Sequence, residues 1–480
     1  MRGMLSRVRV DRAVTVVAAA AVLVALFQVS RQDAALPADP AELLVFLIAI
    51  AIGQAFPVEL SGGRETAPIA MASALALAMV PAGQRFGASP AMVVLVTAAG
   101  MGAGLAARRV AGAQVRLDAT AVRLVCVGVA ALLFGQPRLI DELVGQLAPP
   151  PAPQSWAVTG TALTMIAISL VALTIEALLF ALIRSSRLRT PLRVTVRDEI
   201  KAAGGLSAAM SATGTLIAMA ESSLEAFAVP LFLVPLVMTQ FAVRRQAAIR
   251  RTYGQTIRSL SRLTELGGYT GDGHADRVAV LAVAVGSALG LSESELRDLE
   301  FAALLHDIGQ VALRVPIPGG ATVLAAPADQ RRIASDGADI VRQAGVLDTV
   351  AKIIEAQPTP YRQVREFGEE LPMASRIIKV VNAYEDLVTG SREPDRRERA
   401  IERIHLGLGY EYDPRVVAAL EVIIRRADRT EQVAPPGREE PSGLVQDPAA
   451  SATVSPRAIS PIQGLRLPEG TRGSIGRQVP

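Results

Sequence analysis

Apolar residues gather in the first half of the chain. Residues 13 to about 243 are mostly Ala, Val, Leu and Ile, whereas the remainder has the mixed pattern of a water-exposed protein. A helix that crosses the hydrocarbon core of a bilayer needs about 20 apolar residues. The first half offers eight such stretches: 13–29, 41–58, 67–82, 90–107, 119–135, 156–183, 204–220 and 226–243. The pattern therefore predicts a transmembrane bundle of about eight helices within residues 1–243, the third and seventh being the weakest candidates.

Basic residues between these stretches indicate their orientation, because cytoplasmic loops carry an excess of lysine and arginine. The loops that we place inside contain Arg2, Arg7, Arg9, Arg12, Arg64, Arg108, Arg109, Arg116, Arg184, Arg187, Arg189, Arg193, Arg197 and Lys201. The loops that we place outside contain Arg31, Arg85 and Arg138. The first stretch could also be a signal peptide, but the stretches that follow it closely favour an uncleaved anchor. We expect a multi-pass plasma-membrane protein with both termini in the cytoplasm.

Four residues inside the predicted spans are candidates for special roles. Glu176 is ionisable within a span, which makes it a functional candidate; the simpler expectation is that its side chain extends to the interface or pairs with a neighbouring helix. Arg123 lies near a span end, where its side chain can extend to the interface. Gly100 and Gly104 have the GxxxG spacing that lets helices approach closely, although chance explains it in a region so rich in Ala and Gly. The pattern disfavours a transporter and names no ligand for this region.

An amphipathic segment follows the last predicted span, over residues 244–268. Its apolar positions recur at three- and four-residue steps, which predicts a helix with one apolar stripe. The stripe consists of Ile249, Tyr253, Ile257, Leu260 and Leu263. Gly267 and Gly268 end the helix. The stripe could pair with a second copy as a short coiled coil or pack on the next domain, and the sequence leaves both open.

Composition excludes some classes of protein. The net charge of +4 gives no basis for nucleic-acid binding, and the single cysteine, Cys126, excludes a disulfide framework or a cysteine-based zinc site within one chain. Beyond about Asp428 the chain turns to Pro, Gly, Ser and charged residues. Such a segment cannot bury enough apolar surface to fold, so we predict that residues 429–480 are disordered.

Candidate chemistry lies between the linker and this tail. The three histidines of the chain, His274, His306 and His405, all fall there. His306 precedes Asp307 near the end of an apolar helix in the stretch AALLHDIGQVAL. An imidazole nitrogen and a carboxylate oxygen placed side by side suit zinc, iron or manganese. His405 has no such neighbour, so we expect it to be a surface or hydrogen-bonded core residue.

Longer motifs surround the His-Asp pair. His274 opens the run HADRVAVLAVAVGSALGLSESEL, in which Ser292 and Glu295 form a capping box. Two further stretches are ELPMASRIIKVVNAYEDLVTG and GYEYDPRVVAAL. Together these motifs resemble the HD superfamily of metal-dependent phosphohydrolases, in particular its HD-GYP branch. The resemblance implies an all-helical domain over residues 269–428. The predicted fold class is all-α: a multi-span transmembrane bundle followed by a cytoplasmic HD-type domain.

The resemblance also assigns residues. It places metal ligands at His274, His306 and Asp307, and it puts Asn382 where the family has an aspartate. It places nucleotide contacts at Arg392 and Arg396, with a spacing that differs by one residue. At other positions the residues differ from the family pattern. Gln310 replaces a lysine, and Ile333, Gln357 and Pro358 replace histidines. Thr270 is the residue nearest to an expected glutamate, and residues 361–368 contain no GYP signature.

The resemblance and this ligand count together lead to three functional hypotheses. Two imidazoles and one carboxylate can hold a single divalent ion (Fe, Mn or Zn), whereas a second ion has almost no ligands left. The first hypothesis is a membrane-anchored bacterial signalling protein with a degenerate HD-GYP-like domain, which binds a cyclic dinucleotide or a partner with weak or no catalysis. The second is an active metal-dependent phosphohydrolase, which the resemblance implies would cleave cyclic di-GMP or a different nucleotide. The third is a scaffold. We also expect a homodimer formed through the linker helix.

Overall fold

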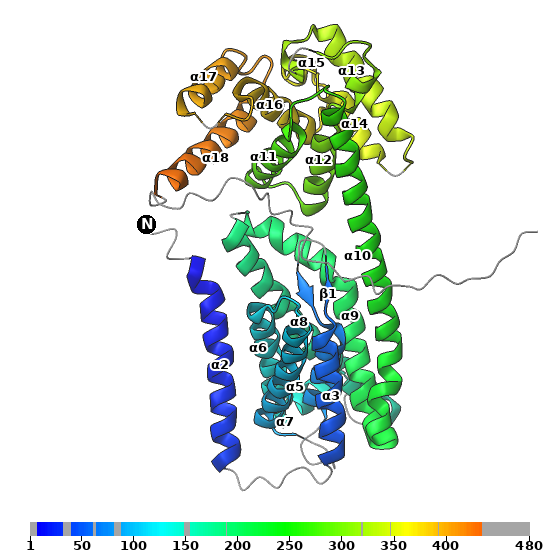
Figure 1. The fold of residues 1–480 in the computed structure, drawn as a ribbon. Coiled ribbons are helices and arrows are strands. Elements are labelled where there is room, and N and C mark those ends of the chain that lie inside the picture. The colour runs from blue at the N-terminus through cyan, green and yellow to red at the C-terminus, as the bar shows by residue number, and fades with distance from the viewer. Residues whose placement is uncertain are drawn as a thin grey trace, which may run out of the picture. The chain divides into compact units, whose positions relative to one another are not determined.

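The computed structural model describes residues 7–31, 40–60, 64–80, 88–147, 154–188, 190–317, 320–345, 347–391 and 393–433. Helices make up most of these residues (Figure 1). The described strands are β1 (Val58–Glu59) and β2 (Glu65–Thr66), which pair antiparallel with Val58 opposite Thr66. The all-α fold class predicted from the sequence is confirmed. The predicted disordered tail lies outside the described residues, apart from its first five, which continue the last helix.

Helices occupy every stretch that the sequence predicted as a span. They are α2 (Arg7–Arg31), α3 (Pro40–Ala55), α4 (Pro68–Met79), α5 (Pro90–Val110), α6 (Leu117–Phe134), α8 (Gln154–Leu188), α9 (Leu192–Leu224) and α10 (Ala228–Leu266). Two short helices connect them: α7 (Pro137–Leu147) and the 3-10 helix η2 (Glu225–Phe227). By length and composition, the described residues contain five stretches able to cross a bilayer, the last of which runs through α9 and α10. The count of eight spans stays a prediction.

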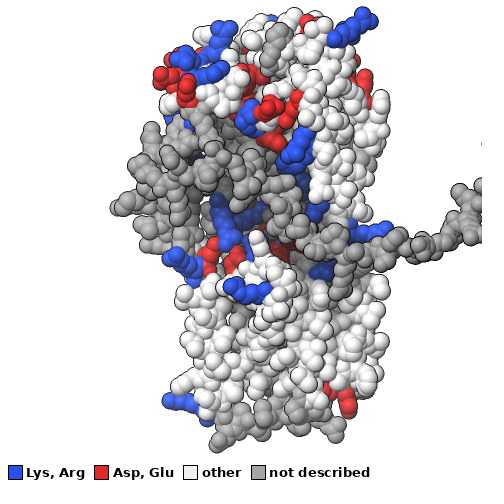
Figure 2. Space-filling model, in the orientation of Figure 1, with Lys and Arg blue, Asp and Glu red and all other residues white. Residues whose placement is uncertain are grey.

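The surface of these helices is apolar. Large apolar side chains that are more than half exposed include Leu23, Phe27, Trp156, Met238 and Phe241. In Figure 2 the visible face of the apolar helices is almost free of charged side chains. An apolar surface this large is unusual for a protein in water, and it is compatible with insertion into a membrane.

Helix α4 is the inner element of this bundle. All twelve of its residues are buried, and they form the centre of the largest apolar cluster. It packs against α3, α6 and α9. Twelve residues rise only about 18 Å along a helix, less than the roughly 30 Å of a hydrocarbon core. The helix α4, as described, is therefore too short to cross a bilayer alone.

The GxxxG pair does bring two helices together, contrary to the expectation that it arose by chance. A β-carbon on Gly100 would lie 2.9 Å from the side chain of Ile50, and one on Gly104 would lie 2.5 Å from the backbone oxygen of Ala51. Both contacts are closer than real side chains tolerate. The two glycines therefore allow α5 to pack on α3 at this distance.

Three buried charges in the bundle, Arg123, Glu176 and Arg64, have polar partners. Arg123 is fully buried, where its guanidinium donates to Gln54 Oε1 at 2.9 Å and to the backbone oxygen of Glu65 at 2.6 Å. The prediction that Arg123 extends to the interface is therefore wrong, because these acceptors hold it inside. Glu176 is buried 3.4 Å from Arg64, so it pairs with a residue just before β2 rather than extending to the interface or pairing with a neighbouring helix. Arg64 also donates to Glu199 at 2.7 Å.

Helix α10 joins two elements that the sequence separated. The last predicted span and the linker form one helix, which ends at Leu266 beside Gly267 as predicted. Ile257 is buried in the core of the C-terminal domain, so this part of the linker packs within that domain. The other stripe residues are exposed by 41 to 54%: Ile249, Tyr253, Leu260 and Leu263.

The C-terminal domain, residues 269–433, is a cluster of helices around α16. Its elements are α11 (His274–Ala288), α12 (Glu293–Leu305), η3 (Ile308–Ala312), η5 (Thr322–Leu324), α13 (Pro327–Arg342), α14 (Asp348–Ala356), α15 (Arg362–Phe367), α16 (Met373–Val388), α17 (Pro394–His405) and α18 (Pro414–Val433). The capping box of Ser292 and Glu295 is present, with both of its hydrogen bonds. Helix α16 is buried along most of its length and contacts α11 and α12. It therefore carries side chains into the centre of the domain.

Candidate metal site

Four residues from three parts of the domain meet at one buried point. His274 is the first residue of α11, His306 caps the end of α12, and Asp307 follows directly. One ligand atom from each of these three lies within 4.8 Å of the others. Asn382 reaches the same point from α16. The structure thus brings together the four residues that the resemblance assigned as metal ligands.

Two glycines position these residues. Gly273 precedes α11 with a φ of 66°, the left-handed conformation that glycine adopts without strain, so the chain turns sharply just before His274. Gly309 lies directly against α13, where an added β-carbon would be 1.9 Å from the backbone oxygen of Ile333. This close approach packs the turn after Asp307 onto α13 and fixes the direction of the His-Asp pair.

Both imidazoles point toward the side chain of Asn382. Its Oδ1 is 2.9 Å from His274 Nε2 and 3.0 Å from His306 Nε2. Its Nδ2 donates to Thr322 Oγ1 at 2.9 Å, which fixes the orientation of the amide and leaves its oxygen on the histidine side. Two ring nitrogens and an amide oxygen therefore converge on one small volume.

The second nitrogen of His306 is held by the backbone. Its Nδ1 is 2.7 Å from the carbonyl oxygen of Ala303. A carbonyl oxygen only accepts, so Nδ1 carries a hydrogen and donates. In the neutral ring this leaves the lone pair on Nε2, which faces the site. A ring nitrogen fixed by a backbone carbonyl while the other faces inward is the arrangement of metal-ligating histidines.

Asp307 directs a carboxylate oxygen, Oδ2, at both imidazoles. Its Oδ2 is 3.1 Å from His306 Nε2 and 3.6 Å from His274 Nε2. It is nevertheless buried without a hydrogen-bond partner among the described residues. Leaving a buried carboxylate oxygen unsatisfied costs free energy unless a cation compensates it. The residues therefore fit a divalent ion bound between the two imidazoles and this carboxylate.

The two histidines differ in their affinity for protons in the metal-free site. Burial lowers the pKa of His274 to about 4, despite the neighbouring carboxylate of Asp307. Burial acts in the same direction on His306, but the carboxylate of Asp307 outweighs it and raises the pKa to about 9. Burial raises the pKa of Asp307, and the charge on His306 reverses this and lowers it. A proton on His306 thus provides positive charge where a metal ion would.

Asp386 also belongs to the site, and sequence reasoning missed it. It lies one helical turn after Asn382 on α16, with Oδ1 3.8 Å from His274 Nε2. Its side chain is 4% exposed. Burial and the nearby carboxylate of Asp307 raise its pKa to about 7. The signal in the sequence is the four-residue spacing from Asn382, which places both side chains on one face of a helix.

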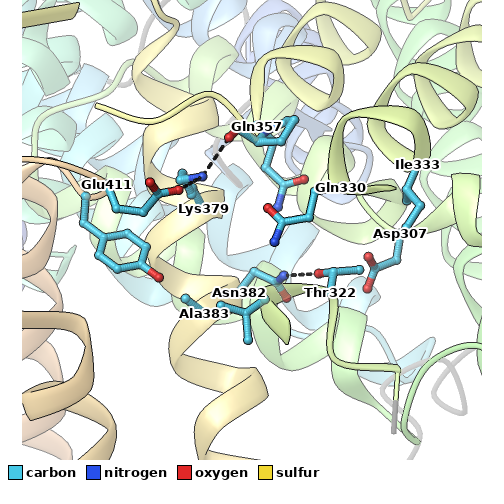
Figure 3. A pocket seen from close by; sticks show the side chains of 12 residues that line it. Asp307, Thr322, Gln330, Ile333, Gln357, Lys379, Asn382, Ala383 and Glu411 are labelled. Carbon is cyan, nitrogen blue, oxygen red and sulfur yellow. Dashed lines mark hydrogen bonds and ion pairs between the residues drawn. The ribbon is translucent and has the colours of Figure 1, made fainter. Parts of the chain in front are cut away.

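A cavity of about 190 Å³ adjoins the site (Figure 3). Asp307 and Thr322 lie on one side of it, with Lys379 and Glu411 on the other. The positions that the resemblance marks as histidines also line it: Ile333, Gln357 and Pro358. Lys379 donates to the backbone oxygen of Pro358 at 2.8 Å and pairs with Glu411 at 2.6 Å. A second cation here would meet an ammonium group and no imidazole.

The remaining candidates lie elsewhere or have other partners. Gln310 is fully buried, and its Nε2 donates weakly to the backbone oxygen of Gly320 at 3.4 Å. Arg396 is exposed and donates to Thr389 Oγ1 at 3.0 Å, and Arg392 lies outside the described residues. Thr270 is buried beside Thr264. His405 is at the surface, 2.6 Å from Glu421, in line with its expected lack of a ligand role.

Comparison with known proteins agrees with this geometry. Residues 258–416 match the family model described as HD domain. The chain is 28% identical over 176 residues to the cyclic di-GMP phosphodiesterase response regulator RpfG of Xanthomonas campestris pv. campestris (strain 8004), a match that covers 34% of this chain and 46% of that protein. The chain thus spans about half the length of this curated relative. No solved structure matches the chain. Residues 258–416 form a domain of the HD superfamily, whose members are metal-dependent.

Proposed function

We propose that this protein is a membrane-anchored bacterial signalling protein whose HD domain binds one divalent metal ion and a cyclic dinucleotide, with weak or no hydrolysis. One observation carries the proposal. The cavity beside the His274, His306 and Asp307 cluster is lined by Ile333 and Gln357 where a second metal ion would need ligands. Efficient phosphodiester cleavage relies on metal ions both to activate water and to hold the phosphate oxygens.

The residues of the site have separate roles in this proposal. A bound divalent ion supplies Lewis acidity toward a phosphate oxygen. His306 is oriented for that ion by Ala303, and Asn382 by Thr322. Lys379 faces the cavity, but its charge is compensated by Glu411 at 2.6 Å. The positive charge available to a transition state is therefore small, which supports weak hydrolysis.

The choice of a cyclic dinucleotide rests on the Xanthomonas relative and on the volume of the cavity. The Xanthomonas relative is named a cyclic di-GMP phosphodiesterase. The cavity of 190 Å³ is smaller than the roughly 300–1,000 Å³ of typical ligand pockets. It can therefore enclose one phosphate group of a cyclic dinucleotide while the rest of the molecule lies outside. Arg396, exposed beyond the end of α16, is a candidate for contact with that outer part.

Two connections support a signalling role. Helix α10 runs without a break from the apolar region to Ile257 in the domain core. Arg184, at the end of the long apolar helix α8, donates to Glu293 at 3.0 Å. Glu293 begins α12, and α12 ends at His306. A displacement of α8 or α10 in the membrane would therefore act on the helix that holds the metal site. Cytoplasmic termini follow from the basic residues of the loops.

The exposed stripe on α10 supports a homodimer. Four apolar residues with three- to seven-residue spacing remain uncovered on this helix, and a second copy of the helix fits such a stripe. In detergent, Leu260→Glu should convert the dimer to a monomer in light scattering, whereas Gln255→Glu, exposed on a different side of α10, should not. A wild-type protein that is monomeric at all concentrations would remove the dimer from the proposal.

Nucleotide titration combined with a turnover assay tests the proposed function. Full-length protein loaded with Mn²⁺ should bind cyclic di-GMP in calorimetry, with turnover at least about a hundredfold below the 1–10³ s⁻¹ of ordinary enzymes. The double variant His306→Ala with Asp307→Ala, which lacks two of the proposed metal ligands, is the negative control. Turnover within the ordinary range would favour the active phosphohydrolase, and the absence of nucleotide binding would favour a scaffold.

A further inference from the structure

We infer that Asp386 is a metal ligand, so that one divalent ion is held by His274, His306, Asp307 and Asp386. This inference rests on the proposed single-metal site and names its fourth protein ligand. Asn382 then serves as a neutral neighbour that orients the site. The argument comes from distances, from hydrogen bonds and from the balance of buried charge.

The distances place Asp386 beside the cluster of His274, His306 and Asp307, whose own ligand atoms all lie within 4.8 Å of one another, through its contact with His274. Donor atoms bound to one zinc ion at about 2.0–2.2 Å lie roughly 3–4 Å from one another. His274 Nε2 is 3.6 Å from Asp307 Oδ2 and 3.8 Å from Asp386 Oδ1. His306 Nε2 is 3.1 Å from Asp307 Oδ2. His274 thus stands between two carboxylates at the separation expected of ligands, and its 3.8 Å distance to Asp386 is too long for a hydrogen bond.

The two oxygens of Asp386 have different surroundings. Oδ2 accepts a hydrogen bond from the backbone nitrogen of Val323 at 3.1 Å, and Asn382 Nδ2 lies 3.5 Å from the same oxygen. Oδ1 faces His274. A carboxylate with one oxygen fixed by the protein and the other directed at an imidazole is oriented as a monodentate ligand. Val323 belongs to η5, as does Thr322, which orients Asn382, so one short element positions both side chains.

The buried carboxylates of the site also favour a bound cation. Asp307 and Asp386 are both almost completely buried. Among the ion pairs of the described residues, Asp386 has no arginine or lysine partner and faces only His274. Its neighbour Glu385 differs, because it pairs with Arg277 at 3.0 Å. A divalent ion between two imidazoles and two carboxylates gives a neutral site, and it would offset the cost of burying both carboxylates.

Metal binding by full-length protein in detergent tests the inference. Apo protein is titrated with Mn²⁺ and Zn²⁺ against a chromophoric chelator, and bound metal is counted by mass spectrometry. Asp386→Asn, nearly the same size, should weaken affinity by at least about 10–100-fold, the loss typical even of outer-shell changes. Glu385→Gln, which neutralises the adjacent carboxylate, should stay within about threefold of wild type, since Glu385 faces Arg277.

Moving the carboxylate from position 386 to position 382 provides a second test. Asn382 Oδ1 lies near both imidazoles, so a carboxylate at position 382 can take over the role. The variant Asp386→Ala should bind the metal ion less tightly than wild type. Adding Asn382→Asp to this variant should raise its metal affinity by at least about tenfold. Thermal melting of the metal-free variants controls for folding. Wild-type affinity in Asp386→Asn would overturn the assignment of Asp386 and leave the single-metal proposal standing. A wild-type protein that binds no metal would overturn both.

Discussion

Glu293 and His306 lie at the two ends of one helix. Glu293 is the first residue of α12 and accepts a hydrogen bond from Arg184 of α8, and His306 caps the other end of α12 within the metal site. The backbone nitrogen of Glu293 also donates to Asp198 of α9 at 3.0 Å. The start of α12 is therefore bound to two helices of the apolar region, and a single rigid element connects them to the His-Asp pair.

Reversing the Arg184–Glu293 pair tests this connection. Arg184→Glu should place two carboxylates together and loosen the first turn of α12, with a cost of about 1 kcal/mol because the pair is only partly buried. Amide hydrogen exchange over the first turn of α12 should therefore be faster in this variant than in the wild-type protein. The exchanged pair Arg184→Glu with Glu293→Arg should recover slow exchange. Unchanged exchange in the single variant would show that the contact does not hold α12.

Ile257 tests whether the end of α10 belongs to the HD domain. Its side chain is 3% exposed and packs in the domain core. A fragment of residues 244–428 should melt cooperatively as a helical protein, and Ile257→Ala should lower its free energy of unfolding by about 2–5 kcal/mol. Ile249→Ala is the matched control, since Ile249 is 48% exposed. Equal destabilisation by both changes would argue against packing of this helix on the domain.

A reporter fusion tests the orientation in the membrane. The basic residues place the segment after the last apolar stretch in the cytoplasm, so a reporter that works only in the cytoplasm should be active when fused after Arg245. The same reporter fused after Arg138, in a loop that we place outside, should be inactive. Activity of an exported reporter such as a phosphatase after Arg245 would refute the proposed topology.

Asn382→Asp tests the electrostatics of the site. The new carboxylate would lie about 3 Å from both Nε2 atoms, at the separations of 2.9 and 3.0 Å that the amide oxygen has now. Metal affinity should rise by roughly tenfold or more, because a charged ligand replaces a neutral one. The metal-free variant should be less stable by ~1–3 kcal/mol, since it buries a further carboxylate beside Asp307 and Asp386. A rise in metal-free stability, or an unchanged affinity, would contradict this description of the site.

Periodicity and motifs predicted much of this structure, because they reflect local rules. The apolar stretches, the capping box at Ser292 and the end of α10 near Gly267 follow from helix length, capping and glycine chemistry. The pairing of His274 with the His-Asp motif came from the resemblance rather than from spacing, since the two histidines lie 32 positions apart in the chain. That the HD superfamily was the correct comparison is confirmed by the family match over residues 258–416.

Long-range packing accounts for the features that the sequence did not reveal. The burial of Arg123 depends on Gln54 and on the backbone of Glu65, both far away in the chain. The close approach at Gly100 depends on Ile50 of another helix. Asp386 is marked in the sequence only by its four-residue spacing from Asn382, and its place beside His274 follows only once α16 is packed against α11 and η5. Neighbours of this kind are not encoded in local patterns.

Counting metal ions in the purified protein tests the central claim most directly. The protein should carry about one divalent ion per chain after loading with Mn²⁺ or Zn²⁺, because two imidazoles and the carboxylates beside them form one site. The double variant His306→Ala with Asp307→Ala should carry none. Two ions per chain in the wild-type protein, or a double variant that retains its ion, would contradict the account.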